Sequence, residues 1–182
     1  MCGKADHFVR GSVEYPDVSS SEKMIAAWRV SLFLFCSVLR GFSAEPDWAA
    51  VEKHAVDLLG RYVQIRSVNP PADTSTTAKL FAAEFAAAKM EAKLYQSGPG
   101  GRTNLLVRLP GRDRSKRPLL LLNHMDVVPV DPSRWTQDPF GAKIVDGVMW
   151  GRGTLDMKST GVIELTSLIL LKQLGIVPPR DI

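Results

Sequence analysis

Three stretches of the chain carry hydrophobic side chains at helical spacing. Between Asp47 and Ser67 apolar residues recur at intervals of three and four, and Asp47 is placed to cap the first turn. An alanine-rich stretch over 76–92 has a similar pattern, and a third stretch, Met157–Leu174, ends at a glycine followed by two prolines. The pattern therefore predicts three helices. The expected buried face of the second consists of Leu80, Phe81, Phe85 and Met90.

Other segments have the pattern of strands. Asn104–Leu109 alternates between polar and apolar residues, and Lys143–Trp150 is predicted to form a hairpin around Asp146-Gly147. Residues 118–123 form a continuous apolar run, which is typical of a strand buried on both faces. Because helices and strands alternate along the chain, the predicted fold class is α/β with a layered sheet.

The N-terminal part follows a different pattern. From Met24 a short stretch ending in Arg29 leads into the apolar run Val30–Leu39 and then into Arg40-Gly-Phe-Ser-Ala44, which is the layout of a secretory signal peptide. The run is too short to cross a bilayer, so no stable membrane span is expected. We expect a leader of doubtful status over 1–23, a signal peptide over 24–44, a mature region over 45–182, and export to the periplasm or the extracellular space. A buried helix or an uncleaved anchor is the alternative.

Composition narrows the function classes. The chain has 182 residues, of which 45% are hydrophobic and 23% charged, which excludes a disordered chain. The net charge is +4, and the cations cluster only at 112–117, where no aromatic residue lies between them. A solvated turn explains that cluster, so nucleic acid is not an expected partner. The two cysteines, Cys2 and Cys36, both precede the predicted domain, so a metal would be held by nitrogen and oxygen donors.

Residues suited to metal binding or catalysis follow directly after the apolar run at 118–123. His124 and Asp126 are two residues apart, so on an extended chain both side chains point to the same side. One imidazole nitrogen could then bind a metal while Asp126 accepts a hydrogen bond from the other. A solvated strand end is the simpler explanation for the pair taken alone.

A second carboxylate, Asp156, lies between the glycine-rich break at 151–153 and the third predicted helix. The glycines allow the backbone to return toward the end of the apolar run, which would bring Asp156 near His124. The alternative is that Asp156 caps the helix. The neighbouring Arg152 and Lys158 are expected to be salt-bridge partners within the loop, with contact to substrate as the alternative.

Several segments follow one another in a recognisable order: His124-Met-Asp-Val-Val-Pro129, Trp135, Asp138-Pro-Phe140, Asp146-Gly147 and Gly151-Arg-Gly-Thr-Leu-Asp-Met-Lys158. Their order and spacing resemble those of the dinuclear zinc metallopeptidases that include aminoacylase, glutamate carboxypeptidase, succinyl-diaminopimelate desuccinylase and carboxypeptidase S. Ser67-Val-Asn-Pro70 resembles an early turn of the same family, so the resemblance extends from about Asp47 onward.

The resemblance implies a fold, a site and a substrate class. The fold would be a layered α/β/α catalytic domain with a mostly parallel central sheet, truncated on its C-terminal side. His124 would be a ligand of one zinc ion, Asp156 would bridge two, and Asp126 would hold the His124 imidazole. A complete site would contain two Zn²⁺ ions, for which Co²⁺ or Mn²⁺ can substitute. The substrates would be small peptides or N-acyl amino acids, and a homodimer is expected only of a full-length form.

The resemblance also identifies what this sequence lacks. Members of the family continue with a strand leading into a Glu-Glu pair, whose first Glu is the general base, and then with further ligands. Arg180-Asp181-Ile182 resembles the beginning of that strand. The expected function is zinc-dependent hydrolysis of amide bonds, with this chain as an N-terminal portion that is inactive and prone to aggregate by itself. The alternative is a non-catalytic truncated product that binds metal weakly.

Overall fold

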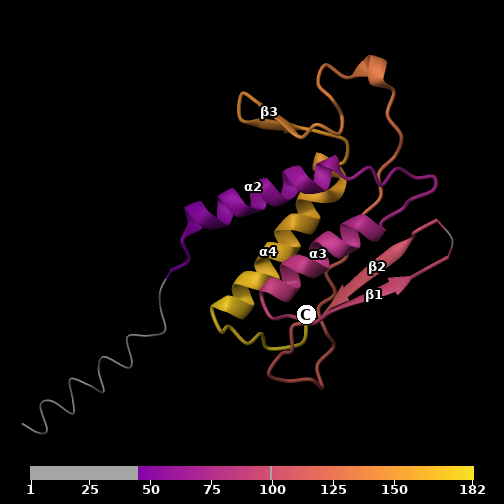
Figure 1. Cartoon of the computed structure of the whole chain (residues 1–182). Coiled ribbons are helices and arrows are strands. Elements are labelled where there is room, and N and C mark those ends of the chain that lie inside the picture. The colour runs from indigo at the N-terminus through magenta and orange to yellow at the C-terminus, as the bar shows by residue number, and fades with distance from the viewer. Residues whose placement is uncertain (1–44, 99) are drawn as a thin grey trace, which may run out of the picture. The chain divides into compact units, whose positions relative to one another are not determined.

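The computed structural model describes residues 45–98 and 100–182, and the predicted leader and signal peptide therefore lie outside the described residues. Its framework is three helices, α2 (Trp48–Gln64), α3 (Ser75–Ala87) and α4 (Ser159–Gln173), which are shown in Figure 1. The side chain of Asp47 accepts a hydrogen bond from the backbone N–H of Ala50, as predicted for a helix cap. All three predicted helices are thus confirmed.

The hydrophobic core lies where the three helices meet. Tyr62 of α2 packs edge-on against Phe81 of α3, with ring centroids 4.9 Å apart, and Leu165 of α4 belongs to the same cluster. Each large apolar side chain buried here contributes about 1.5–3 kcal/mol of transfer free energy. Phe81, Phe85 and Met90 are buried as predicted, whereas Leu80 is only partly buried.

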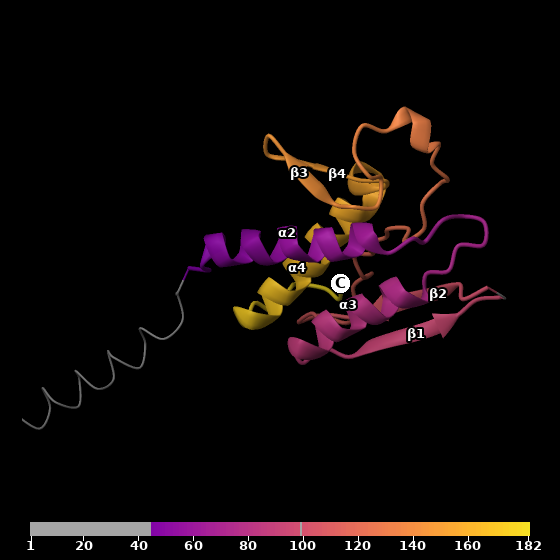
Figure 2. The same ribbon diagram turned by 45° about the horizontal axis from the view of Figure 1, so that its top comes forward.

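An antiparallel pair of strands, β1 (Ala92–Gln96) and β2 (Thr103–Val107), lies beside α3 in both views (Figures 1 and 2). Strand β2 was predicted, but β1 was not. The prediction extended the second helix to residue 92, whereas α3 ends at Ala87 and Lys89 adopts a left-handed conformation with φ of 56°. Pairing with β2 therefore overrides the helix propensity of the alanine-rich sequence.

The second sheet is the predicted hairpin of β3 (Lys143–Val145) and β4 (Val148–Trp150), near the start of α4 (Figure 2). Asp146 and Gly147 form its turn with positive φ angles of 50° and 78°. Two consecutive positive φ angles are what a two-residue hairpin turn requires, and Asp-Gly provides them at low cost. The prediction is confirmed in both position and turn residues.

The predicted strand over residues 118–123 is not formed. The segment belongs to neither sheet, and Leu120 and Leu122 are 70% and 76% exposed, so it is not buried on both faces. Among the described residues, the parallel pairing is confined to a single bridge between Val68 and Val127. The physical reason is that the segment has too few backbone hydrogen bonds to form a ladder. Its bond to the C-terminal residues is from Leu119 N–H to Asp181 C=O. An extended segment without a ladder on either side is not a strand.

The end of the chain is nevertheless firmly attached. Ile182 exchanges two backbone hydrogen bonds with Leu109, and the buried Asp181 carboxylate accepts from Gly111 N–H at 2.8 Å. Arg114, in the basic turn, lies 3.7 Å from the same carboxylate. The turn is thus partly engaged by the chain itself rather than wholly solvated.

The α/β class is confirmed by these elements. In the part of the chain that the structure describes, no helix is both long and apolar enough to cross a membrane.

Candidate metal centre

His124 lies at the end of residues 118–123 and has an oxygen acceptor at each ring nitrogen. Nδ1 is 2.9 Å from the backbone carbonyl oxygen of Asp126, and Nε2 is 3.1 Å from Oδ1 of Asp156. The predicted meeting of His124 with Asp156, 32 positions later, is therefore present in the structure.

Asp156 reaches His124 from an irregular turn, Thr154–Lys158, just before α4. The turn can approach because Gly153 has φ of +84°, and a Cβ at this position would lie 2.6 Å from a methyl carbon of Val127. The helix-cap alternative is wrong, because α4 is preceded by Lys158 at its cap position and Asp156 does not cap it. The Asp156 side chain is 88% exposed, so the His124–Asp156 pair faces solvent.

Asp126 lies on the Nδ1 side of the imidazole, as predicted, but its backbone makes the closer contact. Its carbonyl oxygen is 2.9 Å from Nδ1, and its carboxylate Oδ1 is 3.4 Å away. The other carboxylate oxygen accepts a hydrogen bond from Asn69 Nδ2 at 2.8 Å. Asn69 thus fixes the carboxylate that faces His124, a contact that the motif analysis did not identify.

The turn that carries Asn69 is fastened to the His124 segment by its backbone. Asn69 N–H donates to Val127 C=O, Val127 N–H donates to Ser67 C=O, and the Ser67 hydroxyl donates to Met125 C=O. Ser67 is fully buried. The early Ser-x-Asn-Pro turn therefore positions the His124 segment, which gives a physical reason for these residue types.

The pKa of His124 reflects this environment. Partial burial by itself lowers the pKa, but the hydrogen bonds to Asp156 and to the Asp126 carbonyl, with the charges of both carboxylates, outweigh it. The pKa is raised above the ordinary value of 6.5. In the metal-free chain, an imidazolium that donates from both nitrogens satisfies the two acceptors.

Among the residues that the structure describes, Lys158 and Arg152 do not form the predicted salt bridges. Lys158 is buried, and its Nζ donates to the carbonyl oxygens of Tyr62 and Ile65, at 2.9 Å each, while lying 4.7 Å from the Tyr62 ring centroid. Burial lowers the pKa of Lys158 to about 8. The Arg152 guanidinium stacks over Trp135 at 5.4 Å. Lys158 therefore ties the turn that carries Asp156 to the end of α2.

His124 and Asp156 provide two of the donor atoms that a zinc site needs. Nε2 of His124 and Oδ1 of Asp156 are 3.1 Å apart. This is close to the roughly 3.4 Å expected for two donors at about 2.1 Å from one tetrahedral zinc ion. Nitrogen and carboxylate oxygen both suit Zn²⁺, and Nδ1 is held by an oxygen acceptor, as is usual for a metal-binding histidine. Among residues 45–98 and 100–182, however, no group of three or more His, Cys, Asp or Glu side chains is placed to hold a metal.

The segment that contains these residues is similar to known proteins. Residues 120–182, which contain His124, Asp126 and Asp156, match Peptidase family M20/M25/M40. Aminoacylase-1 of Sus scrofa is 34% identical over 140 residues, which cover 72% of this chain and 32% of that protein. Succinyl-diaminopimelate desuccinylase 2 of Ruegeria sp. (strain TM1040) is 56% identical over 50 residues, or 27% of this chain and 13% of that protein.

The fold also has a match among solved structures. Human carnosine dipeptidase 1 superposes with a TM-score of 0.58 at 22% identity, over 73% of this chain and 32% of that one. The sequence matches confirm the resemblance inferred from the motifs, and the superposition shows the likeness of fold. The chain spans about a third of the length of aminoacylase-1 and of the dipeptidase.

Proposed function

We propose, from the similarity of this chain to the peptidases of family M20/M25/M40, that it is the N-terminal portion of a zinc-dependent hydrolase of amide bonds. The observation that carries the proposal is the contact between His124 and Asp156, in the segment that matches the family. The relatives are named for acylamino acids, a succinylated amino acid and a dipeptide, so the proposed substrates are small peptides or N-acyl amino acids.

Each site residue has a proposed task. His124 binds one metal ion through Nε2, and Asp156 supplies a carboxylate that can bridge two ions. The backbone carbonyl oxygen of Asp126 accepts a hydrogen bond from Nδ1–H and so fixes the tautomer that leaves Nε2 free for the metal. Asn69 holds the Asp126 carboxylate in place. When bound, a pair of zinc ions would polarise the amide carbonyl and promote the ionisation of water near neutral pH.

The same geometry supports a second proposal for the 182 residues taken alone, namely weak metal binding without hydrolysis. Catalytic zinc usually has three protein donors and one water, whereas His124 and Asp156 provide two. The described residues bring no third donor to the pair. Cobalt and manganese also accept nitrogen and oxygen donors, and manganese would bind the pair more weakly than cobalt.

Metal titration tests the site. We expect calorimetry to show weak zinc binding by the 182-residue chain, which His124→Ala and Asp156→Asn each abolish. Asn69→Ala and Asp126→Asn should weaken binding by about 10-fold or more, because they disturb the contacts that orient the histidine.

The control is His54→Ala, since His54 lies on α2 and contacts Glu84 instead of the site. Zinc binding that survives in both the His124 and the Asp156 variants would contradict the proposed site. Hydrolysis of N-acetylmethionine by the purified chain, lost on chelation, would support the first function over the second.

Export remains a separate proposal, supported by the pattern of residues 24–44 alone. N-terminal sequencing of the secreted or periplasmic protein should find a mature chain beginning near Glu45. Retention of residues 24–44 in that material would contradict it.

A further inference from the structure

Six basic side chains gather beyond the end of β2. The turn that follows β2, residues 108–117, lies beside residues 174–182, which follow α4 (Figure 1). A backbone hydrogen bond joins the two segments, because Arg112 N–H donates to Pro178 C=O at 2.8 Å. The fold thus forms one exposed group of cations, the basic patch, which consists of Arg108, Arg112, Arg114, Lys116, Arg117 and Arg180.

Two cations of the basic patch share one carboxylate. Arg108 Nη1 lies 3.4 Å from Oδ2 of Asp181, and Arg114 Nε lies 3.7 Å from the same oxygen. The Asp181 side chain is buried, whereas most of both arginine side chains is exposed. One carboxylate therefore serves two guanidinium groups, and each group keeps donors that a second anion can use.

The charge of the patch is not balanced by its surroundings. Asp113 Oδ2 lies 3.7 Å from Lys116 Nζ, and both side chains are about half exposed. Across residues 108–117 and 178–182, six basic side chains face two carboxylates, so the local net charge is +4. The net charge of the whole chain is also +4. The excess positive charge of the chain is therefore concentrated at this one place.

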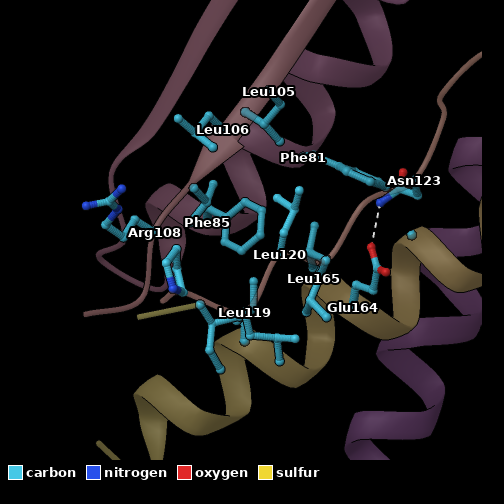
Figure 3. Close-up of a pocket in the computed structure, with 16 residues that line it drawn as sticks. Phe81, Phe85, Leu105, Leu106, Arg108, Leu119, Leu120, Asn123, Glu164 and Leu165 are labelled. Carbon is cyan, nitrogen blue, oxygen red and sulfur yellow. Dashed lines mark hydrogen bonds between the residues drawn. The ribbon is translucent and has the colours of Figure 1, made fainter. Parts of the chain in front are cut away.

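The cations of the patch are available to a partner. Figure 3 shows the Arg108 side chain directed away from Phe85, which lines the apolar pocket behind it. Arg180 Nη1 donates to the Arg117 carbonyl oxygen at 3.5 Å, a contact with backbone that leaves the charge of Arg180 unpaired. Within the described residues, Arg112 and Arg117 form no ion pair.

Exposed apolar side chains border the patch. Ile176 and Val177 are 49% and 50% exposed, and they directly precede Pro178, whose carbonyl oxygen accepts from Arg112 N–H. Both lie in the turn after α4 and outside the hydrophobic core. Cations beside exposed apolar groups suit the surface of an anionic membrane, because the charges attract the headgroups while the apolar groups enter the acyl boundary.

We propose that the basic patch, with Ile176 and Val177, docks this chain on the surface of an anionic phospholipid membrane. Arginine suits this task because a guanidinium group can bind two phosphate oxygens at once. Nucleic acid fits less well, since no aromatic residue lies between the cations of 112–117 to stack on a base. The binding is peripheral and needs no helix that spans the bilayer.

Docking at the patch leaves the candidate metal centre uncovered. Asp156 precedes α4, whereas Ile176 follows it, and the 15 residues of this helix extend over about 22 Å. The metal centre and the patch therefore lie at opposite ends of α4. A membrane-bound chain keeps the His124–Asp156 pair open to water, so membrane binding and metal binding can be measured independently.

Vesicle flotation of the 182-residue chain tests the proposal. The vesicles are phosphatidylcholine alone or phosphatidylcholine with about one quarter phosphatidylglycerol. The patch variant keeps the contacts of Arg108 and Arg114 with Asp181 and combines Arg112→Gln, Lys116→Gln and Arg117→Gln. The matched control removes three exposed cations on α3, β1 and β3 by Lys79→Gln, Lys93→Gln and Lys143→Gln. Residues 1–44 are present in every chain, so any contribution from them cancels in the comparison.

A second variant, Ile176→Ser with Val177→Ser, removes the apolar side chains and keeps every cation. The wild-type chain is expected to float with the anionic vesicles at low salt and to be released as salt rises, because exposed charges are screened beyond about 10 Å at 0.1 M. The patch variant should lower the partition coefficient at least about tenfold, the apolar variant about threefold, and the lysine control less than about twofold.

Equal flotation of the wild-type chain with neutral and anionic vesicles, or flotation that salt does not weaken, would overturn the proposal whatever the variants do. Equal losses in the patch variant and the lysine control would also overturn it, because they would show an effect of net charge alone. Tighter binding to single-stranded DNA than to anionic vesicles, unchanged in the apolar variant, would identify nucleic acid as the partner instead.

Discussion

The two oxygen acceptors around His124 make the metal-free site depend on a proton. Nε2 and Asp156 Oδ1 are 3.1 Å apart, and both ring nitrogens must carry hydrogen to satisfy their neighbours. A zinc ion would occupy the position of the proton between Nε2 and the carboxylate. Metal and proton therefore compete, and metal binding is expected to weaken as the pH falls.

The raised pKa of His124 predicts a pH effect on the stability of the metal-free chain. Below the unfolded-state pKa, near 6.5, the imidazolium is charged in both states and the contribution of the pair is fully present. As the pH rises through the higher folded-state pKa, that contribution is lost. Urea unfolding in the presence of a chelator should show a decrease in the free energy of unfolding over this interval, with a smaller decrease in Asp156→Asn. Identical pH profiles for the two chains would contradict the assignment.

Lys158 is predicted to be essential to the stability of the same region. Lys158→Met removes both hydrogen bonds to the end of α2 and should lower the free energy of unfolding by about 3 kcal/mol, because two carbonyl groups lose a charged donor. Lys172→Met, at an exposed position of α4, is the matched control and should change stability by less than about 0.5 kcal/mol. Denaturant unfolding measures both, and equal effects would refute the buried role.

At the residue scale, the sequence predicted which residues lie close together better than it predicted which side chains are buried. The proximity of His124 and Asp156 was expected from the glycine-rich break at 151–153, but Lys158 was expected to form a salt bridge within the loop. A lysine inside a motif looks the same in sequence whether it is solvated or buried. Its burial depends on the end of α2, 93 to 96 positions earlier, which no local pattern encodes.

Among the elements, the attachment of the chain end depends on Gly111. Gly111→Ala would place a Cβ 2.1 Å from the Arg180 backbone and should lower the free energy of unfolding by about 2–3 kcal/mol while releasing residues 178–182. Gly60→Ala, within α2, is the control, because its Cβ would find its nearest neighbours at 3.9 Å. That change should stabilise the chain by about 0.5–1 kcal/mol. Thermal unfolding and carboxypeptidase digestion of the C-terminus would show the difference, and a Gly111 variant as resistant as the wild type would contradict it.

Helices and the β3–β4 hairpin were predictable because their signals are local. Helical spacing, the Asp47 cap and the Asp146-Gly147 turn each act within a few residues. Strand β1 was missed because its alanine- and lysine-containing sequence becomes a strand only when β2 is beside it. Residues 118–123 have the composition of a central strand, but a strand also needs edges to pair with, and only Leu119 bonds to the chain end.

At the scale of the whole described chain, apolar side chains of β2 and of residues 118–123 lie at the surface. Leu106, Leu120 and Leu122 are 48%, 70% and 76% exposed, whereas Leu105 and Val107 pack against the helical core. We predict that the chain self-associates and that Leu120→Lys with Leu122→Lys reduces the association without lowering the thermal midpoint. The control adds the same charge elsewhere, at the exposed Leu174 and Ile176. Light scattering over a range of concentrations measures the effect, and equal improvement by both pairs would point to net charge alone.

The bonds of Lys158 to the end of α2 also impose an order of events on folding. Lys158 and Tyr62 are 96 positions apart, and at a synthesis rate of about 5–20 residues per second the ribosome needs roughly 5–19 s to proceed from one to the other. During that interval α2 exists without its lysine, and the turn that carries Asp156 has not been made. The metal centre is therefore among the last parts of the described chain to form, and a nascent chain contains the residues of α2 well before it has any place for an ion.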